Sequence, residues 1–475
     1  MRSTNPLPQV LLQRAASCVR HIAPLRGFVQ LGPRTPPVDP SRGRIPLCAA
    51  VESVYKAGSW RCDHSRLKVR IRAVKLPVSR AADSGVRDLS RAALVAALRP
   101  DSGDFVSLVQ MHAQRIDWPW VVERAKTHKV AALLAGRVES GGVAALLAAD
   151  SATQLRAIRA EACRHAHTAR RALHELAGQF SRERIPLLVV KGSVLAECVY
   201  GDPTLRRFFD IDIVVPPDSV DRTEALLRSV GYRLGQVEKL LAAQPNGDAE
   251  ARLAEAVTYQ FYRRFEYELP FVVSKGMSGL AVDLHWHIAP RARLRISPQE
   301  LWRHTVPVAV ADTEVLTLTP AATVIHLAVH ATTCAFAGFR LLHLCDVAWA
   351  AAHFGDQLDG VWELAERWGI DAHLDGVFAM TEGVLGVSLP AVVRRAGRAR
   401  NALTRPAFAV AASATFLVGD AGASNAAWWK RAWNEVTWSL AMRCLRHNLG
   451  RSVRVRLSRM RWQWRRWRLA RRPRD

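Results

Sequence analysis

The chain has 475 residues, 49% of them hydrophobic, so it can bury a sizeable core over about three domain lengths. Its formal net charge of +25 first suggests a nucleic acid or an anionic surface as partner. However, residues 1–80 hold 15 Lys/Arg and 3 Asp/Glu, and residues 441–475 hold 13 Arg and one Asp. Between them, residues 81–440 hold 39 basic and 38 acidic side chains, which indicates a near-neutral globular body between two basic ends.

Cysteines and uncharged stretches argue against several classes of protein. The eight cysteines are scattered and form no C-x-x-C pair, which disfavours a zinc ribbon or a disulfide scaffold and favours the reducing cytoplasm. The N-terminus lacks the compact apolar segment of a secretory signal. The longest uncharged stretch near the centre, 315–339, contains two histidines, a proline and several threonines. We therefore expect a strand and a buried helix there, and no transmembrane segment.

Residues 1–80 mix proline, glycine, arginine and short apolar pieces without a sustained period, which is typical of disordered or loosely structured sequence. Transit peptides share this Arg-rich, acid-poor composition. A misplaced start codon in GC-rich DNA would also produce it, and we favour that interpretation. Apolar residues then recur at helical spacing over 85–150, which predicts a small helical domain. A long helix, capped by Ser151, is expected to run to about Arg182.

After this helix, the spacing of the apolar residues changes from that of a helix to that of strands. The continuous apolar run "IPLLVV" (Ile185–Val190) predicts a strand buried on both faces, followed by "KGS" and a short helix to Tyr200. "FFDIDIVV" is the second predicted strand, and "YQFYRRFEYEL" and "LAVDLHWHI" alternate as two more strands would. We therefore predict an α+β protein with a small mixed sheet over 151–318, flanked by helical regions at 85–150 and 319–440, and ending in a basic tail at 441–475.

Two carboxylates stand inside the second strand. Asp210 and Asp212 are two residues apart, so both point to one face, while aromatic and β-branched side chains occupy the other. Carboxylates about 5 Å apart repel each other by roughly 3 kcal/mol at an effective dielectric constant near 20. Divalent cations on the carboxylate oxygens would make this cost functional. Asp283, in the alternating run "VDLHWHI", offers a third carboxylate for a two-metal site, which suits phosphoryl or nucleotidyl transfer.

Donors for a triphosphate are expected in "VVKGSVLAE". Gly192 lets the backbone approach a phosphate, and Ser193 offers a hydroxyl at the start of a helix. Lys191 adds a positive charge, although a surface lysine at a strand end is the simpler interpretation. Arg206 and Arg207 precede the acidic strand and could also reach phosphate.

These residues carry a family resemblance. The segment from "IPLLVVKGSVLAECVYGDPTLRRFFDIDIVV" through "VDLHWHI" resembles the uncharacterised nucleotidyltransferase family of the DNA polymerase β superfamily. The resemblance covers about residues 90–400 and is strongest at 185–290. It differs in a longer spacing between the Gly-Ser pair and the acidic strand.

The resemblance implies a role for each motif. It assigns Gly192 and Ser193 to the nucleotide phosphates, and Asp210, Asp212 and Asp283 to two Mg²⁺ ions. It also implies that Asp283 takes the proton of the acceptor.

Several neighbouring side chains leave alternatives open. Glu266 and Glu268 compete with Asp283 for the place of the third acid. By alternation His285 shares a face with Asp283, where it would orient that acid, contact the nucleotide or simply pack. His287 follows on the same face. Most Asp-Pro turns use the carboxylate only to form the turn, which is our expectation for Asp202.

The histidines of the helical region do not form a standard metal motif. His326 and His330 lie four residues apart on one predicted helix face, but the glutamate of an H-E-x-x-H zinc site is missing. We expect Asp346 and Arg340 to hold helices together.

The sequence predicts a Mg²⁺-dependent nucleotidyltransferase that moves a nucleoside monophosphate from a nucleoside triphosphate to an unidentified acceptor, with release of pyrophosphate. The alternative is a non-catalytic nucleotide- or nucleic-acid-binding protein with the same domain. The C-terminal tail places Trp462, Trp464 and Trp467 among arginines. Such a tail suits an anionic lipid surface or single-stranded nucleic acid, or is simply solvated.

Overall fold

The computed structural model describes residues 81–394, except 236–258, 261, 264–266, 274–278, 290–295 and 339. The chain divides into two units, Met1–Pro77 and Val78–Asp475, and all described residues belong to the second. The predictions for 1–80, for residues 395–440 of the helical region and for the 441–475 tail therefore lie outside the described residues.

Five helices open the described chain: α3 (Ala81–Leu98), α4 (Gly103–His112), α5 (Trp118–Thr127), α6 (Ala131–Ser140) and α7 (Ala149–Arg182). Asp117 fixes the start of α5, because its side chain accepts a hydrogen bond from the backbone N of Trp120 at 3.1 Å. The predicted cap of α7 is wrong. The helix begins two residues before Ser151, which is buried inside its first turn.

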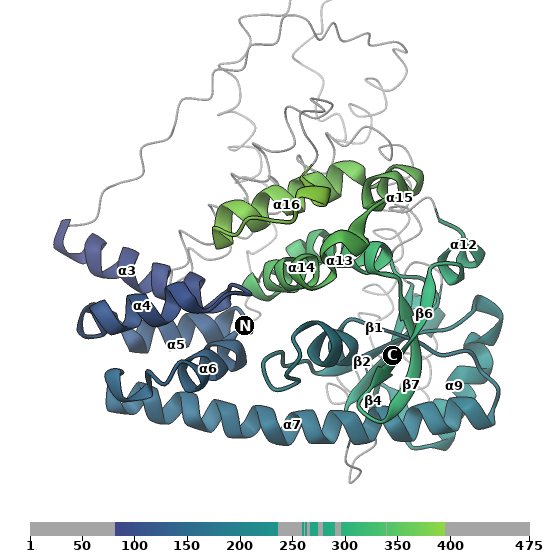
Figure 1. Cartoon of the computed structure of the whole chain (residues 1–475). Coiled ribbons are helices and arrows are strands. Elements are labelled where there is room, and N and C mark those ends of the chain that lie inside the picture. Colours follow the sequence, from purple (N-terminus) through teal and green to yellow (C-terminus); the bar gives the residue numbers. More distant parts are fainter. Residues whose placement is uncertain are drawn as a thin grey trace, which may run out of the picture. The chain divides into compact units, whose positions relative to one another are not determined.

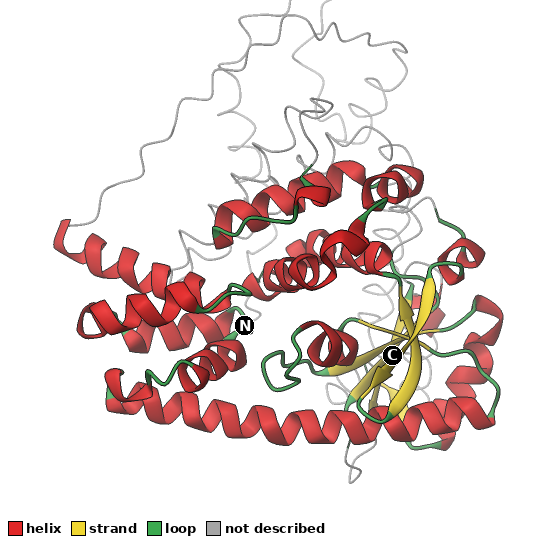
Figure 2. Ribbon diagram, viewed as in Figure 1, coloured by secondary structure: helices red, strands yellow, loops and turns green. Residues whose placement is uncertain are grey.

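The sheet has seven strands in the order β3-β4-β5-β2-β1-β7-β6 (Figures 1 and 2). Parallel pairs β2–β5 and β1–β7 are combined with antiparallel pairs elsewhere, which confirms the predicted α+β class with a mixed sheet. The strands are β1 (Leu188–Val190), β2 (Asp210–Val214), β3 (Tyr232–Leu234), β4 (Glu268–Val273), β5 (Ala281–His285), β6 (Thr305–Val310) and β7 (Thr313–Leu318). Short helices α8 (Gly192–Val194), α9 (Val220–Ser229) and α12 (Pro298–Trp302) connect them.

The register separates the two faces of the sheet. Val189, Ile211 and Val282 belong to a buried cluster formed with α7 and α9. The opposite face carries Asp212, which is aligned with Val190 on one side and with Asp283 on the other. One face is therefore an apolar core, and the other carries the acidic residues.

The strand expected over "YQFYRRFEYEL" is wrong in its placement. Residues 259, 260, 262 and 263 are helical, and β4 begins only at Glu268. By contrast, the uncharged stretch 315–339 forms the predicted strand, β7, and the predicted helix, α13 (Pro320–Gly338). Among the described residues, no helix combines the length and apolarity that a bilayer span requires.

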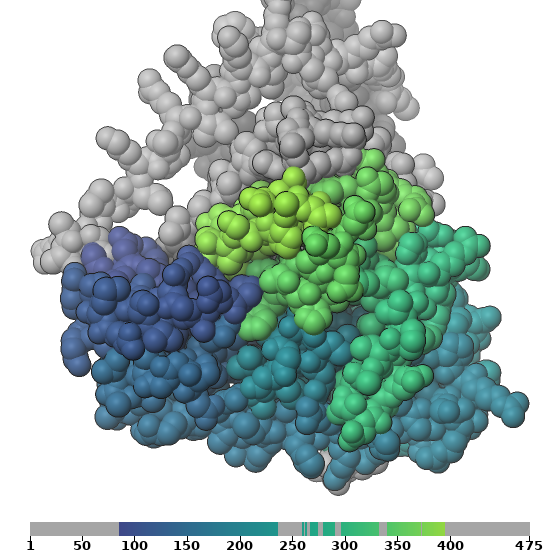
Figure 3. All heavy atoms as spheres, in the orientation of Figure 1, coloured from purple at the N-terminus to yellow at the C-terminus, as the bar shows by residue number. Residues whose placement is uncertain are grey.

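Helices α13, α14 (Leu341–Phe354), α15 (Val361–Trp368) and α16 (Asp371–Leu385) share one buried core with the N-terminal helices. Trp349 Nε1 on α14 donates to the Leu98 carbonyl at 3.0 Å, and Arg99 Nε donates to the Leu385 carbonyl at 2.7 Å. Figure 3 shows the purple-blue surface of the first helices against the yellow-green surface of α16. The two helical regions therefore pack together, although the sheet separates them in sequence.

Candidate active site

The turn between β1 and α8 has an unusual backbone. Lys191 adopts φ 54° and ψ −123°, a conformation that non-glycine residues rarely adopt and that is common at functional sites. At the next residue, a Cβ on Gly192 would lie 3.1 Å from Phe208 Cδ2 and 3.3 Å from the Asp210 carbonyl oxygen. Glycine therefore allows the turn to pass directly beside the start of the acidic strand.

The three predicted carboxylates line one cavity of about 480 Å³, within the usual range for small-molecule sites. The parallel pairing of β2 and β5 aligns Asp212 with Asp283, and Asp210 lies on the same face of β2. Ligand atoms of Asp212, Asp283 and His285 all lie within 4.8 Å of one another. Asp210 lines the same cavity without being part of that tight group.

Asp212 is the most strongly stabilised anion of the site. Its Oδ1 lies 2.6 Å from Lys191 Nζ and 3.1 Å from His285 Nε2. Burial alone would raise the pKa of Asp212, but the Lys191 ammonium and the His285 hydrogen bond hold it well below its usual range. Asp212 is therefore ionised whenever the protein is folded near neutral pH.

The pKa values of the other two acids, Asp283 and Asp210, are shifted in the opposite direction, upward. Burial, followed by repulsion from Asp212, raises the pKa of Asp283 to about 7. Burial and Asp212 also raise the pKa of Asp210. The site therefore favours a cation or a proton among these oxygens.

His285 contacts Asp212 and a second acid. Its Nδ1 lies 3.4 Å from Glu268 Oε2, so the ring bridges two carboxylates. Although burial opposes it, the Asp212 hydrogen bond raises the pKa of His285. Glu268, one rival for the third acid, also lines the cavity, whereas Glu266 lies outside the described residues. His287 bonds elsewhere, with Nε2 3.3 Å from the Ile296 carbonyl oxygen.

Arg206 is held by a carboxylate of the C-terminal helices. Its Nε and Nη2 donate to Asp346 Oδ1 and Oδ2 at 2.7 and 2.8 Å, and its Nη1 lies 3.4 Å from the Gly192 carbonyl oxygen. Tyr200 donates its hydroxyl to the same carboxylate at 3.0 Å. Asp346 therefore links α14 to Tyr200 and to Arg206 in the loop before β2. Through its contact with the Gly192 carbonyl oxygen, Arg206 braces the turn at Gly192.

Ser193 does not line the cavity that holds the carboxylates. Its buried Oγ has no hydrogen-bond partner among the described residues. It borders a separate small pocket with Arg170, Glu197 and Phe208, while the large cavity is lined by Gly192. Lys191, Gly192 and Arg206 therefore line the same cavity as the acids, whereas Ser193 does not.

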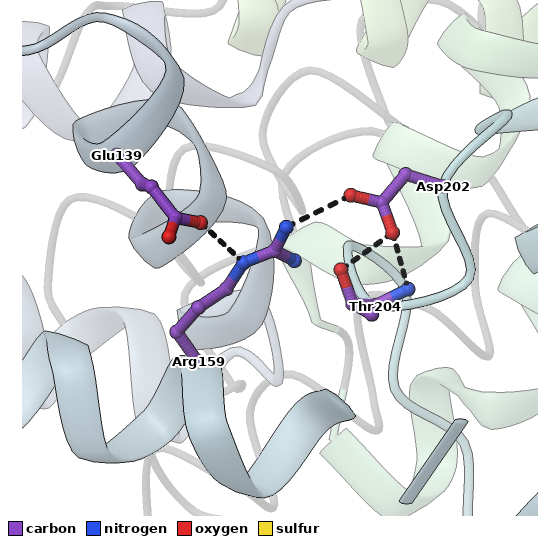
Figure 4. A network of polar contacts seen from close by, with 4 residues as sticks. All are labelled: Glu139, Arg159, Asp202 and Thr204. Atoms are coloured by element: carbon purple, nitrogen blue, oxygen red, sulfur yellow. Dashed lines mark hydrogen bonds and ion pairs between the residues drawn. The ribbon is translucent and has the colours of Figure 1, made fainter. Parts of the chain in front are cut away.

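Figure 4 shows how the loop before β2 is anchored to the N-terminal helices. Arg159 Nε donates to Glu139 at 2.6 Å, and its Nη2 donates to Asp202 at 3.0 Å. Asp202 Oδ1 also accepts from the backbone N and Oγ1 of Thr204 at 2.8 and 2.5 Å. The expected turn at Asp202 is confirmed, and an ion pair that the sequence did not indicate fixes it to α7.

Sequence reasoning missed the part of the cavity wall that comes from distant segments. Lys129, between α5 and α6, places Nζ 4.8 Å from the ring centre of Phe209, which is 50% exposed. Tyr267, Arg340 and Leu342 also line the cavity. No local pattern marks these residues, because only the packing of the helical regions brings them to the sheet.

Comparisons with known proteins identify the family of the chain. The model of a family described as "Uncharacterised nucleotidyltransferase" matches residues 114–386. No curated protein matches the chain significantly. Among solved structures, the antibiotic-resistance factor ANT(2'')-Ia is 14% identical, with a TM-score of 0.27 over 45% of this chain and 95% of its own.

Proposed function

Because the chain belongs to this uncharacterised nucleotidyltransferase family, we propose that it moves a nucleoside monophosphate from a nucleoside triphosphate to an acceptor and releases pyrophosphate. The observation that carries the proposal is the alignment of Asp212 with Asp283 beside the Gly192 turn. A cavity of about 480 Å³ on that face provides room for a nucleotide.

The chemistry of the acids fits magnesium. Asp210, Asp212 and Asp283 present carboxylate oxygens, the ligands that hard divalent cations prefer. The raised pKa of Asp283 reports a negative potential that a cation would relieve. Bound by these three residues, Mg²⁺ would stabilise the negative charge that develops on the transferring phosphate.

Phosphate contacts are proposed for Lys191 and Gly192. Gly192 has no side chain to block a phosphate, and Lys191 brings an ammonium group to the same cavity. Arg206 is proposed to position the turn, because Asp346 already binds its guanidinium in a bidentate manner. For Ser193 only the backbone is proposed, since the residue borders the other pocket.

Asp283 is proposed to accept the proton of the acceptor. The acceptor oxygen attacks the α-phosphorus, the bond from that phosphorus to the bridging oxygen breaks, and pyrophosphate leaves with the electron pair. Asp283 would be ionised once a cation relieves the repulsion that raises its pKa, as a carboxylate that takes up this proton must be. We propose that the reaction takes place in the cytoplasm. The basic tail, residues 441–475, is proposed to contact an anionic surface.

The test is transfer of label from each of the four α-³²P nucleoside triphosphates to components of a cell extract. The wild-type chain should form labelled product with Mg²⁺, and Asp212→Asn should form none. Asp221→Asn is the matched control, because that carboxylate is 80% exposed and pairs with Arg263 outside the cavity. Nucleotide binding without labelled product would favour the non-catalytic alternative.

A further inference from the structure

The ammonium group of Lys191 is already paired with Asp212, the acid that is central to the candidate metal site. Lys191 Nζ lies 2.6 Å from Asp212 Oδ1, and the two side chains are only 10% and 6% exposed. The same oxygen also contacts His285. Asp212 therefore has an internal cation bound to it, in a buried position where electrostatic interactions are strong.

The same carboxylate belongs to the group that could hold a metal ion. Ligand atoms of Asp212, Asp283 and His285 lie within 4.8 Å of one another. A divalent cation among them would be within a few ångströms of the Lys191 ammonium, and the two positive charges would repel each other. The lysine and the metal thus compete for Asp212.

The lysine can move without rearranging the turn. Its backbone is fixed by the strained conformation at φ 54° and by the hydrogen bond from Leu195 N to its carbonyl oxygen at 2.8 Å. Its side chain, by contrast, is a flexible four-carbon stem with a compact charge at the end. Lys191 also lines the cavity together with Gly192, where the triphosphate is proposed to lie. A displaced ammonium would find an anion there.

We propose that Lys191 is a displaceable counter-ion, which competes with the divalent metal for Asp212 and transfers to the nucleotide triphosphate when that binds. This inference rests on the proposed function. It predicts that metal and nucleotide each bind weakly alone and strengthen each other, because the nucleotide removes the competitor of the metal. Such coupling is reciprocal by thermodynamic necessity.

The test measures binding rather than turnover. Mn²⁺ affinity of the full chain is determined by electron paramagnetic resonance, with and without α,β-methylene-ATP, for wild type, Lys191→Met and Lys129→Met. Lys129 is the matched control, because it lines the same cavity but its charge lies against the Phe209 ring. Lys191→Gln provides a second, polar replacement, and circular dichroism checks that each variant is folded.

Lys191→Met and Lys191→Gln should bind Mn²⁺ roughly tenfold tighter than wild type or better without nucleotide, whereas Lys129→Met should stay within about threefold. The ATP analogue should strengthen Mn²⁺ binding to wild type and do so much less in the Lys191 variants. Unchanged or weaker Mn²⁺ binding by both Lys191 variants would overturn the inference, as would an equal gain in Lys129→Met. If wild type still transfers label in that case, only the inference fails. If no variant binds Mn²⁺, the metal site and the proposed function fail as well.

Discussion

Replacing Asp283 by asparagine should stabilise the metal-free protein much more at alkaline pH than at acid pH. Burial and the neighbouring Asp212 raise the pKa of Asp283 from 3.8 to about 7. In the unfolded chain this carboxyl loses its proton near pH 4, whereas in the folded protein it holds the proton until about pH 7. The folded state therefore binds more protons between these values, and the contribution of Asp283 to stability is lost as pH rises through that window.

The magnitude follows from the shift. A difference of about three pKa units corresponds to at most about 4 kcal/mol, and shared titration with Asp210 reduces this to about 2–4 kcal/mol. Asparagine has nearly the same shape and no charge. In EDTA at pH 8, Asp283→Asn should therefore exceed the wild type in free energy of unfolding by about 2–4 kcal/mol. At pH 5 the gap should shrink to about 1.5 kcal/mol, because the folded wild type then holds the Asp283 proton and only the cost of protonating the carboxyl that is ionised in the unfolded chain remains.

Urea denaturation followed by circular dichroism measures both free energies. Asp221→Asn, at an exposed carboxylate outside the cavity, is the control for replacement of an aspartate by asparagine. Addition of Mg²⁺ at pH 8 should stabilise the wild type more than Asp283→Asn, because only the wild type keeps all three acids. A gap that is the same at pH 5 and pH 8, or a less stable Asp283→Asn at pH 8, would refute the electrostatic reasoning.

Three further changes test other parts of the structure. Asp346→Asn leaves the buried Arg206 guanidinium without its anion, so the free energy of unfolding in urea should fall by about 3–5 kcal/mol; a loss under 1 kcal/mol would contradict the bracing role. Gly192→Ala places a methyl group 3.1 Å from Phe208 and so should shift the turn at the proposed phosphate contact, which should lower nucleotide affinity in equilibrium dialysis at least several-fold and also lower the melting temperature; wild-type affinity would argue against phosphate contact at this turn. Deletion of residues 441–475 should abolish sedimentation with anionic phosphatidylserine vesicles, and retained sedimentation would exclude the tail as the contact.

The shared position of Asp210 and Asp212 on one face of the sheet could be predicted, because side chains alternate between the two faces along a strand. Asp210 and Asp212 share a face in any strand, and Asp283 falls on the same face once β5 pairs with β2 in parallel. The glycine beside them was found because only a residue without a side chain suits a close approach. Strand β4 was misplaced, because the alternating aromatic residues before it also fit a helix, which residues 259–263 adopt in the part described.

The remaining features depend on contacts that no local pattern encodes. Arg206 meets Asp346, which lies 140 positions later, and so braces the turn where the sequence indicated a phosphate ligand. Ser193 follows the glycine, but the residue borders another, smaller pocket instead of the cavity with the acids. Lys129 lines the cavity because the N-terminal helices share one buried core with α14 and the other C-terminal helices.

The central claim is tested most directly by comparing the position of the label in the nucleoside triphosphate. The chain should transfer ³²P from the α-position, release one pyrophosphate for each labelled product, and lose both activities in Asp210→Asn and Asp212→Asn. Transfer of ³²P from the γ-position alone, or α-label transfer that survives in both variants, would contradict nucleotidyl transfer at these carboxylates.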